Sequence, residues 1–208
     1  KEHHKKTIMR REEKKLILHL KKLKELGDKV PNWNYKYYGK YDNISELKNL
    51  LAGLTKEDWS FYDWRQTEHG PHKATETIPI LFDPKYGTHR GKESKFYPLF
   101  KEELNKLSLV LPKAEIIRAV LVKLPKGEEV KAHWDYGNES FREHPRIHMA
   151  VQTNQHVNFN IGGEEKNMKL GEFWEINNFV KKHGVKNLGD TDRIHLIVDI
   201  KQLPVSLV

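Results

Sequence analysis

The stretch "RIHMAVQTNQHVNFNIGGEEKNMKLGEFWEINN", residues 146–178, decides the fold class of this chain. It holds three short runs, "RIHMAVQT", "HVNFNIG" and "GEFWEINN", that are rich in β-branched and aromatic residues and bounded by Gly, Asn or Pro, as strands are. Runs of the same kind come before it at 115–124 and after it at 193–200. Consecutive short strands without helices between them indicate an antiparallel β-sandwich or barrel.

The first half of the chain carries helix patterns instead. Leu16, Leu20 and Leu23 lie at helical spacing among lysines, which predicts an amphipathic helix over 10–26 that packs on the β domain or on a partner subunit. We therefore expect a mainly β protein with an N-terminal helical extension, residues 1–60, and a β domain, residues 61–208. The remaining expectations are a helix with an Asn43–Glu46 capping box, a short helix from Thr55, a strand at 76–82, a helix around 97–108, and irregular structure at 32–42.

Composition narrows the classes of function. The chain of 208 residues has no cysteine, so it forms no disulfide, and any metal site must use His, Asp or Glu. No apolar run approaches the roughly 20 residues of a membrane span, and no apolar signal segment opens the chain. We expect a soluble cytoplasmic protein without a membrane partner.

The positive charge of the chain is concentrated at its N-terminus. Residues 1–27 hold ten lysines and arginines against four glutamates, so this segment carries +6 of the net charge of +8. The other 181 residues carry only +2. This distribution favours a solvated helix face and argues against nucleic acid as a partner of the β domain.

One group of residues carries candidate chemistry. His133 and Asp135, in "AHWDYGN" at 132–138, are two apart, so in an extended chain their side chains project to the same side. His183 follows about fifty residues later. Two histidines and one carboxylate form the facial triad of non-haem Fe(II) oxygenases, although the same ligands could also hold zinc.

The second histidine is followed by an arginine that could bind a cosubstrate. Arg193 comes ten residues after His183 and opens an apolar run, "RIHLIVDI". An iron oxygenase that uses 2-oxoglutarate needs a fixed cation for the distal carboxylate of that cosubstrate, and arginine offers a bidentate partner. We therefore interpret Arg193 as that cation.

The motifs "HWD", "RIHMAVQT", "GEFWEINN" and "HGVKNLGDTDRIHLIVD" resemble the aspartyl/asparaginyl β-hydroxylase family of Fe(II)- and 2-oxoglutarate-dependent oxygenases, over roughly residues 76–200. The resemblance implies a double-stranded β-helix, the jelly roll of cupin-like proteins. It also implies a dioxygenase that uses Fe(II), 2-oxoglutarate and molecular oxygen. The expected reaction hydroxylates an unactivated carbon of an amino acid or of a peptide or protein side chain and releases succinate and CO₂.

The resemblance also assigns roles to single residues. It implies that His133, Asp135 and His183 hold the metal and that Arg193 binds the far carboxylate of 2-oxoglutarate. Arg146 and His148 match a pair that helps to hold the cosubstrate. Some members use an arginine on an acidic substrate where this chain has His144, and Arg65, in the aromatic and cationic segment 61–80, is our first candidate for a substrate carboxylate.

Two other functions remain open from the residues. The first is a nucleic-acid-modifying 2-oxoglutarate oxygenase with the same ligands. Oxygenases of the alkylation-repair type typically repeat an arginine six residues after the first, and this chain has Asp199 there. The second is a non-catalytic, cupin-like module that binds a metal without turnover.

Overall fold

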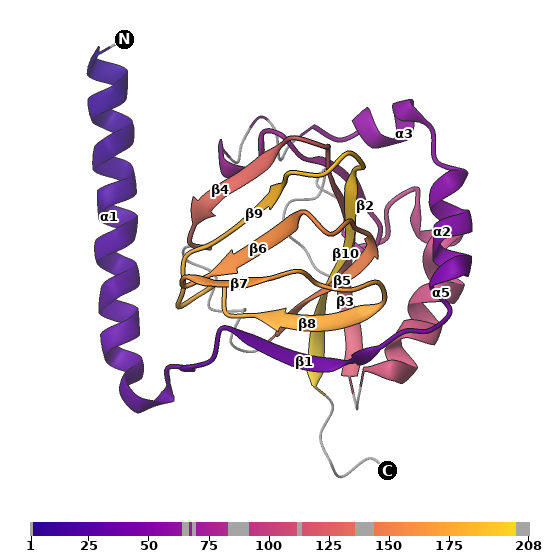
Figure 1. Ribbon diagram of the computed structural model, residues 1–208. Coiled ribbons are helices and arrows are strands. Elements are labelled where there is room, and N and C mark those ends of the chain that lie inside the picture. Colours follow the sequence, from indigo (N-terminus) through magenta and orange to yellow (C-terminus); the bar gives the residue numbers. More distant parts are fainter. Residues whose placement is uncertain are drawn as a thin grey trace.

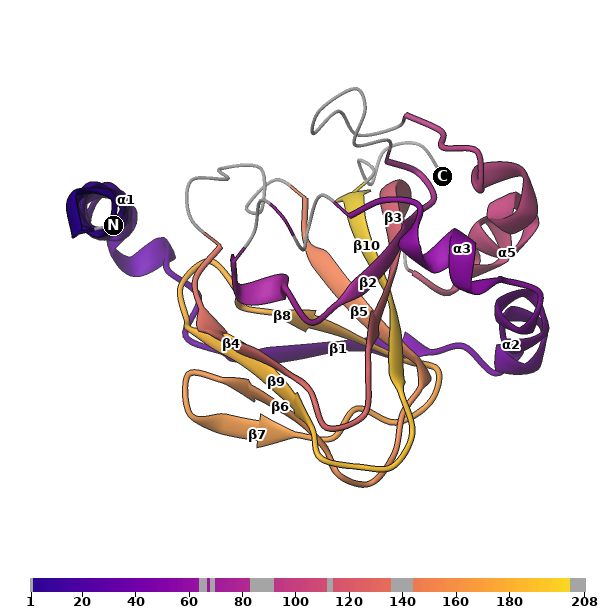
Figure 2. The same cartoon turned by 90° about the horizontal axis from the view of Figure 1, so that it is seen from above.

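The computed structural model describes all residues except 1, 64–66, 68–69, 83–91, 112–113, 136–143 and 203–208. Its strands form two antiparallel sheets that face each other, as Figures 1 and 2 show. The six-stranded sheet has the order β1-β8-β5-β10-β3-β2 and the four-stranded sheet the order β4-β9-β6-β7. This is the jelly roll that was expected.

The strands are β1 (Tyr35–Lys40), β2 (Glu76–Pro79), β3 (Ala114–Leu124), β4 (Glu129–His133), β5 (Arg146–Gln152), β6 (Val157–Ile161), β7 (Glu164–Lys166), β8 (Glu172–Ile176), β9 (His183–Asn187) and β10 (Arg193–Gln202).

The central strands β3, β5 and β10 of the six-stranded sheet are buried on both faces. Because side chains alternate along a strand, β10 sends Leu196 and Val198 outward into a core shared with the helices, and Arg193 and Ile197 inward to a cavity between the sheets. β5 follows the same rule. These strands are rich in apolar and β-branched residues and are bounded by turn residues, which is why they could be recognised in the sequence.

Three helices cover the outer face of this sheet, α2 (Ile44–Ala52), α3 (Lys56–Ser60) and α5 (Tyr97–Val110) (Figure 2). α3 begins with a capping box in which Thr55 Oγ1 accepts a hydrogen bond from the Asp58 backbone and Asp58 accepts one from the Thr55 backbone. The capping box expected at Asn43 is wrong. The Asn43 side chain makes no cap hydrogen bond, and its backbone carbonyl instead accepts a bond from the Glu46 backbone at 3.2 Å.

The expectation of irregular structure at 32–42 is also wrong, since Tyr35–Lys40 forms β1. This strand pairs antiparallel with β8, with Tyr35 opposite Ile176. Its burial does not alternate regularly, which hid it from a periodicity argument. β1 ties the proposed N-terminal extension, residues 1–60, into the main sheet, and the division at residue 60 stays a prediction.

The N-terminal helix α1 (Glu2–Leu26) is present, and its half-buried face includes Leu16 and Leu23 of the three expected leucines, but not Leu20. Leu20 is 53% exposed, whereas His19 is only 3% exposed and packs edge-on against Phe179 at 5.0 Å between ring centroids. The ring of Trp134, one residue after His133, also lies near His19, with 6.1 Å between the ring centroids. α1 thus touches the β domain through a face centred on a histidine. Among the described residues, no helix is both long and apolar enough to cross a membrane.

Candidate active site

Strands β4 and β9 bring two histidines together. His133 ends β4, His183 begins β9, and the two residues stand directly opposite each other in the antiparallel ladder. Their ring centroids lie 4.3 Å apart. His133 Nδ1 lies 2.7 Å from the Lys131 carbonyl oxygen, a hydrogen bond that places the proton on Nδ1 and leaves the Nε2 lone pair for a metal.

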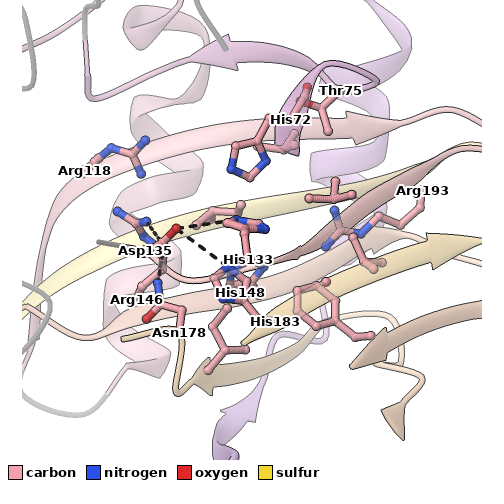
Figure 3. A pocket seen from close by; sticks show the side chains of 17 residues that line it. His72, Thr75, Arg118, His133, Asp135, Arg146, His148, Asn178, His183 and Arg193 are labelled. Atoms are coloured by element: carbon pink, nitrogen blue, oxygen red, sulfur yellow. Dashed lines mark hydrogen bonds and ion pairs between the residues drawn. The ribbon is translucent and has the colours of Figure 1, made fainter. Parts of the chain in front are cut away.

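Asp135 completes the cluster from the segment after β4. Its Oδ1 lies 3.6 Å from His133 Nε2 and 3.8 Å from His183 Nε2 (Figure 3). Its Oδ2 accepts a hydrogen bond of 2.6 Å from the Asn178 amide and one of 3.3 Å from Arg146. These two bonds fix the carboxylate so that Oδ1 faces the two imidazoles.

The protonation states of the cluster suit a divalent cation. Burial lowers the pKa of His183 to about 4, only partly opposed by the charge of Asp135, so the imidazole is neutral near pH 7. Burial raises the pKa of Asp135, but the charges of His183 and Arg146 outweigh this effect and the pKa lies below its ordinary value. Two imidazoles and one carboxylate, with His133 Nε2 buried and without a hydrogen-bond partner in the described structure, fit Fe(II).

A turn sets the interval between His183 and Arg193. Asn187, which ends β9 and is fully buried, donates hydrogen bonds from its amide to the carbonyl oxygens of Leu124 (3.1 Å) and Thr191 (2.9 Å). These bonds fold the chain back sharply, so that β10 begins at Arg193. Arg193 is 2% exposed, and its guanidinium carbon lies 5.4 Å from the centroid of the Phe159 ring.

The predicted ligands and Arg193 line the same cavity, which has a volume of about 70 Å³. His148, 6% exposed, lines it as well, with its ring 5.3 Å from that of Phe159. Next to it His195 is 1% exposed, and burial together with the charge of Arg193 holds its pKa well below the ordinary value. This part of the cavity is therefore a buried basic and aromatic chamber.

Arg146 forms hydrogen bonds with a buried aspartate that its expected role did not include. Its Nε and a terminal nitrogen donate hydrogen bonds of 2.8 and 3.1 Å to the two carboxylate oxygens of Asp199, which is fully buried. Arg118 approaches the same carboxylate at 3.9 Å from the neighbouring strand. Arg146 thereby connects Asp199 to Asp135, and its contact with the cosubstrate stays a prediction.

The structure adds cavity residues that sequence reasoning missed. Asn178 and Arg118 line the cavity, and so do His72 and Thr75 from the segment 61–80, which was singled out only as a substrate region. No periodic pattern marks these residues, because they reach the cavity from three separate parts of the chain. Of the two substrate candidates, Arg65 lies outside the described residues, and His144 is half-buried and does not belong to the cavity lining.

Comparison with solved structures finds the same architecture elsewhere. The chain is similar to an oxidoreductase of the 2OG-Fe(II) oxygenase family from Burkholderia pseudomallei, with a TM-score of 0.56, 12% identity, and coverage of 88% of this chain and 89% of that one. It is also similar to a viral collagen prolyl hydroxylase from Paramecium Bursaria Chlorella virus-1 (TM-score 0.51, 8% identity, coverage 84% and 99%). A Pseudomonas putida prolyl-4-hydroxylase matches with a TM-score of 0.50, 14% identity, and coverage of 85% and 97%.

Sequence comparison identifies the family. A search of curated protein sequences finds no significant match. The sequence model of the aspartyl/asparaginyl beta-hydroxylases, however, matches residues 45–202, which include all ten strands except β1. Since this match covers well over half of the chain, the protein belongs to the aspartyl/asparaginyl β-hydroxylase family of Fe(II)- and 2-oxoglutarate-dependent oxygenases.

Proposed function

We propose that His133, Asp135 and His183 hold the Fe(II) of this hydroxylase and that Arg193 binds the distal carboxylate of 2-oxoglutarate. The observation that carries the proposal is the convergence of both Nε2 atoms on Asp135 Oδ1, at 3.6 and 3.8 Å, in a cavity that Arg193 also lines. Fe(II), 2-oxoglutarate and O₂ together supply the oxidation of a C–H bond to an alcohol, with release of succinate and CO₂.

The side chains of the cavity prepare it for these ligands. The bond from His133 Nδ1 to the Lys131 carbonyl holds the imidazole so that Nε2 faces the cluster, and Asn178 and Arg146 orient Asp135. A buried arginine beside an aromatic ring excludes water from the carboxylate that it binds, which strengthens the ion pair. The reaction needs no protein group as a general base in this arrangement.

The substrate that we propose is an amino acid, free or within a peptide or protein, as the family name indicates. Arg118 lies beside the Arg146–Asp135 side of the cluster, apart from Arg193 in Figure 3, and is the described cation best placed to meet a substrate carboxylate. This position replaces His144, which does not line the cavity, as our candidate.

Succinate formation tests the proposal. The purified chain is incubated with Fe(II), 2-oxoglutarate and oxygen, first with each free amino acid and then with a peptide library, while succinate and a product 16 Da heavier than the substrate are followed. His183→Ala should abolish both signals, because only two of the three proposed ligands remain. His156→Ala, which changes an exposed histidine away from the cavity, serves as the control. Wild-type turnover by His183→Ala at limiting iron would show that the ligand assignment is wrong.

A further inference from the structure

A third imidazole faces the proposed metal ligands across the cavity. His72 ends the short 3₁₀ helix η2 (Gly70–His72), lines the cavity, and lies with its ring centroid 4.8 Å from that of His133 at an interplanar angle of 89°. One ring nitrogen of His72, one of His133 and a carboxylate oxygen of Asp135 lie within 4.8 Å of one another. Figure 3 shows His72 on the wall opposite these residues.

The backbone holds His72 in this place. The carbonyl oxygen of His72 accepts two hydrogen bonds from Thr75, one of 2.8 Å from the hydroxyl and one of 2.9 Å from the backbone N–H. Thr75 is 1% exposed and leads directly into β2. The turn is therefore anchored to the sheet on one side, and the imidazole stays near the cluster without being part of a β-ladder.

We propose that His72 is a fourth, displaceable protein ligand of the metal, bound while the cavity is empty of cosubstrate and substrate. The inference rests on the proposed metal centre. A metal that His133, Asp135 and His183 held would keep positions open for the cosubstrate and for oxygen. An imidazole from His72 would fill one of these positions.

The size of the cavity gives a reason for His72 to leave. The volume of about 70 Å³ is far below the ~300 Å³ or more of typical ligand pockets, and displacement of the His72 ring would enlarge the space for cosubstrate and substrate. His133 and His183 are fixed by the β4–β9 ladder, whereas His72 sits on a three-residue turn. Displacement of His72 on entry of these ligands would then free the position for oxygen at the time when a substrate is present.

Nickel binding to the intact chain tests the proposal without turnover. The number of imidazole ligands is counted by X-ray absorption spectroscopy, and the nickel dissociation constant is measured by competition with a chelator. We expect three imidazoles in the wild type and two in His72→Ala, with affinity at least about tenfold weaker, as for the loss of a residue that supports a metal site. Addition of 2-oxoglutarate and a substrate should bring the wild type to two imidazoles and narrow the difference in affinity.

Two further variants keep the test decisive. Lys73→Ala changes the next, exposed residue of the same turn and should keep three imidazoles and wild-type affinity. His72→Gln keeps a polar side chain and serves as a substitute if His72→Ala folds poorly. It should also show two imidazoles. Two imidazoles in the wild type, three in a His72 variant, or equal affinities would overturn the proposal. Nickel binding that survives in His133→Ala would instead contradict the metal centre itself, so the two failures are distinguishable.

Discussion

Asp135 depends on a neighbouring amide for its orientation. Asn178 is 3% exposed, donates the 2.6 Å hydrogen bond to Asp135 Oδ2, and offers its backbone carbonyl to the Asp135 N–H at 3.3 Å. A hydrogen bond to a charged group contributes about 1.5–3 kcal/mol. The amide would therefore act on the proposed metal through the carboxylate that it holds.

We predict that Asn178→Ala weakens metal binding by about 10- to 100-fold, the loss usual when a partner of a metal ligand is removed. The pKa of Asp135 should rise as well, because the hydrogen bond from the Asn178 side chain is one of the effects that lower this pKa. Asn177→Ala is a matched control, since the Asn177 amide binds the carbonyl oxygens of Pro31 and Trp33 and not the cluster. Chelator competition with both variants measures the effect, and equal nickel affinities would contradict it.

Arg193 allows a test of the cosubstrate site that is independent of the metal. Removal of a buried partner of a carboxylate costs about 2–5 kcal/mol, so Arg193→Ala should lower the affinity for 2-oxoglutarate by tens- to thousands-fold. Arg193→Lys should restore it only in part, because an ammonium group cannot form the bidentate pair. Calorimetric titration of 2-oxoglutarate into the nickel-loaded proteins measures both, with nickel affinity as the control. An unchanged affinity for 2-oxoglutarate in both variants would refute the assignment.

At the scale of elements, the alignment of β4 with β9 creates the pair of histidines. Gly184 follows His183, and a Cβ atom at this position would lie 2.9 Å from the Val130 carbonyl oxygen and 3.1 Å from the Ala132 backbone nitrogen. Real Cβ atoms do not approach backbone so closely, so a side chain here would push the two strands apart. Glycine at 184 thus permits the close approach that brings His133 opposite His183.

Gly184→Ala should therefore reduce both stability and metal affinity. Forcing an extra methyl group into a packed site costs about 1–3 kcal/mol, and the displaced strand carries His133 away from the cluster. Gly53→Ala, at the end of α2, serves as the control because its Cβ would meet nothing closer than 3.4 Å. Urea unfolding and chelator competition measure the two effects. A Gly184→Ala protein that binds nickel like the wild type would show that the strand alignment is not critical.

The elements also explain which features could be read from the sequence. The strands buried on both faces, such as β5 and β10, were found because they are rich in β-branched and apolar residues and are bounded by turn residues. The two-residue spacing correctly placed His133 and Asp135 on one side, even though β4 ends at His133. β1, the burial of His19 in the contact face of α1 and the position of His72 were missed, because each depends on tertiary contacts that leave no periodic signal.

At the scale of the whole molecule, the two faces of the six-stranded sheet serve different purposes. The outer face of the six-stranded sheet packs with the helices in a large apolar core, while the inner face of the same strands places arginines, histidines and Asp199 around the cavity. Apolar residues of the four-stranded sheet, including Phe159 and Val185, close the cavity from the other side. The burial that stabilises the fold therefore also removes water from the ionisable groups of the site.

This burial makes the stability of the metal-free protein depend on pH. His183 has a pKa of about 4 in the folded chain against 6.5 for an unperturbed histidine, and the pKa of His195 is also lowered by burial. Between pH 4 and 6.5 the unfolded chain therefore binds more protons than the folded one, and acidification favours unfolding. Across this window, each such histidine should raise the free energy of unfolding by up to about 1.4 kcal/mol per pH unit. Above pH 6.5 these histidines should contribute no further increase.

Urea unfolding in the presence of a chelator, at a series of pH values from 4 to 7.5, measures this slope. His195→Leu should show a smaller slope than the wild type between pH 4 and 6.5, because one of the two buried histidines no longer titrates. Saturating nickel should steepen the loss of stability on acidification, since protons then compete with the metal for His183. A metal-free slope that is absent, or that His195→Leu leaves unchanged, would show that these histidines are accessible to protons in the folded protein and that the cavity is wetter than its burial indicates.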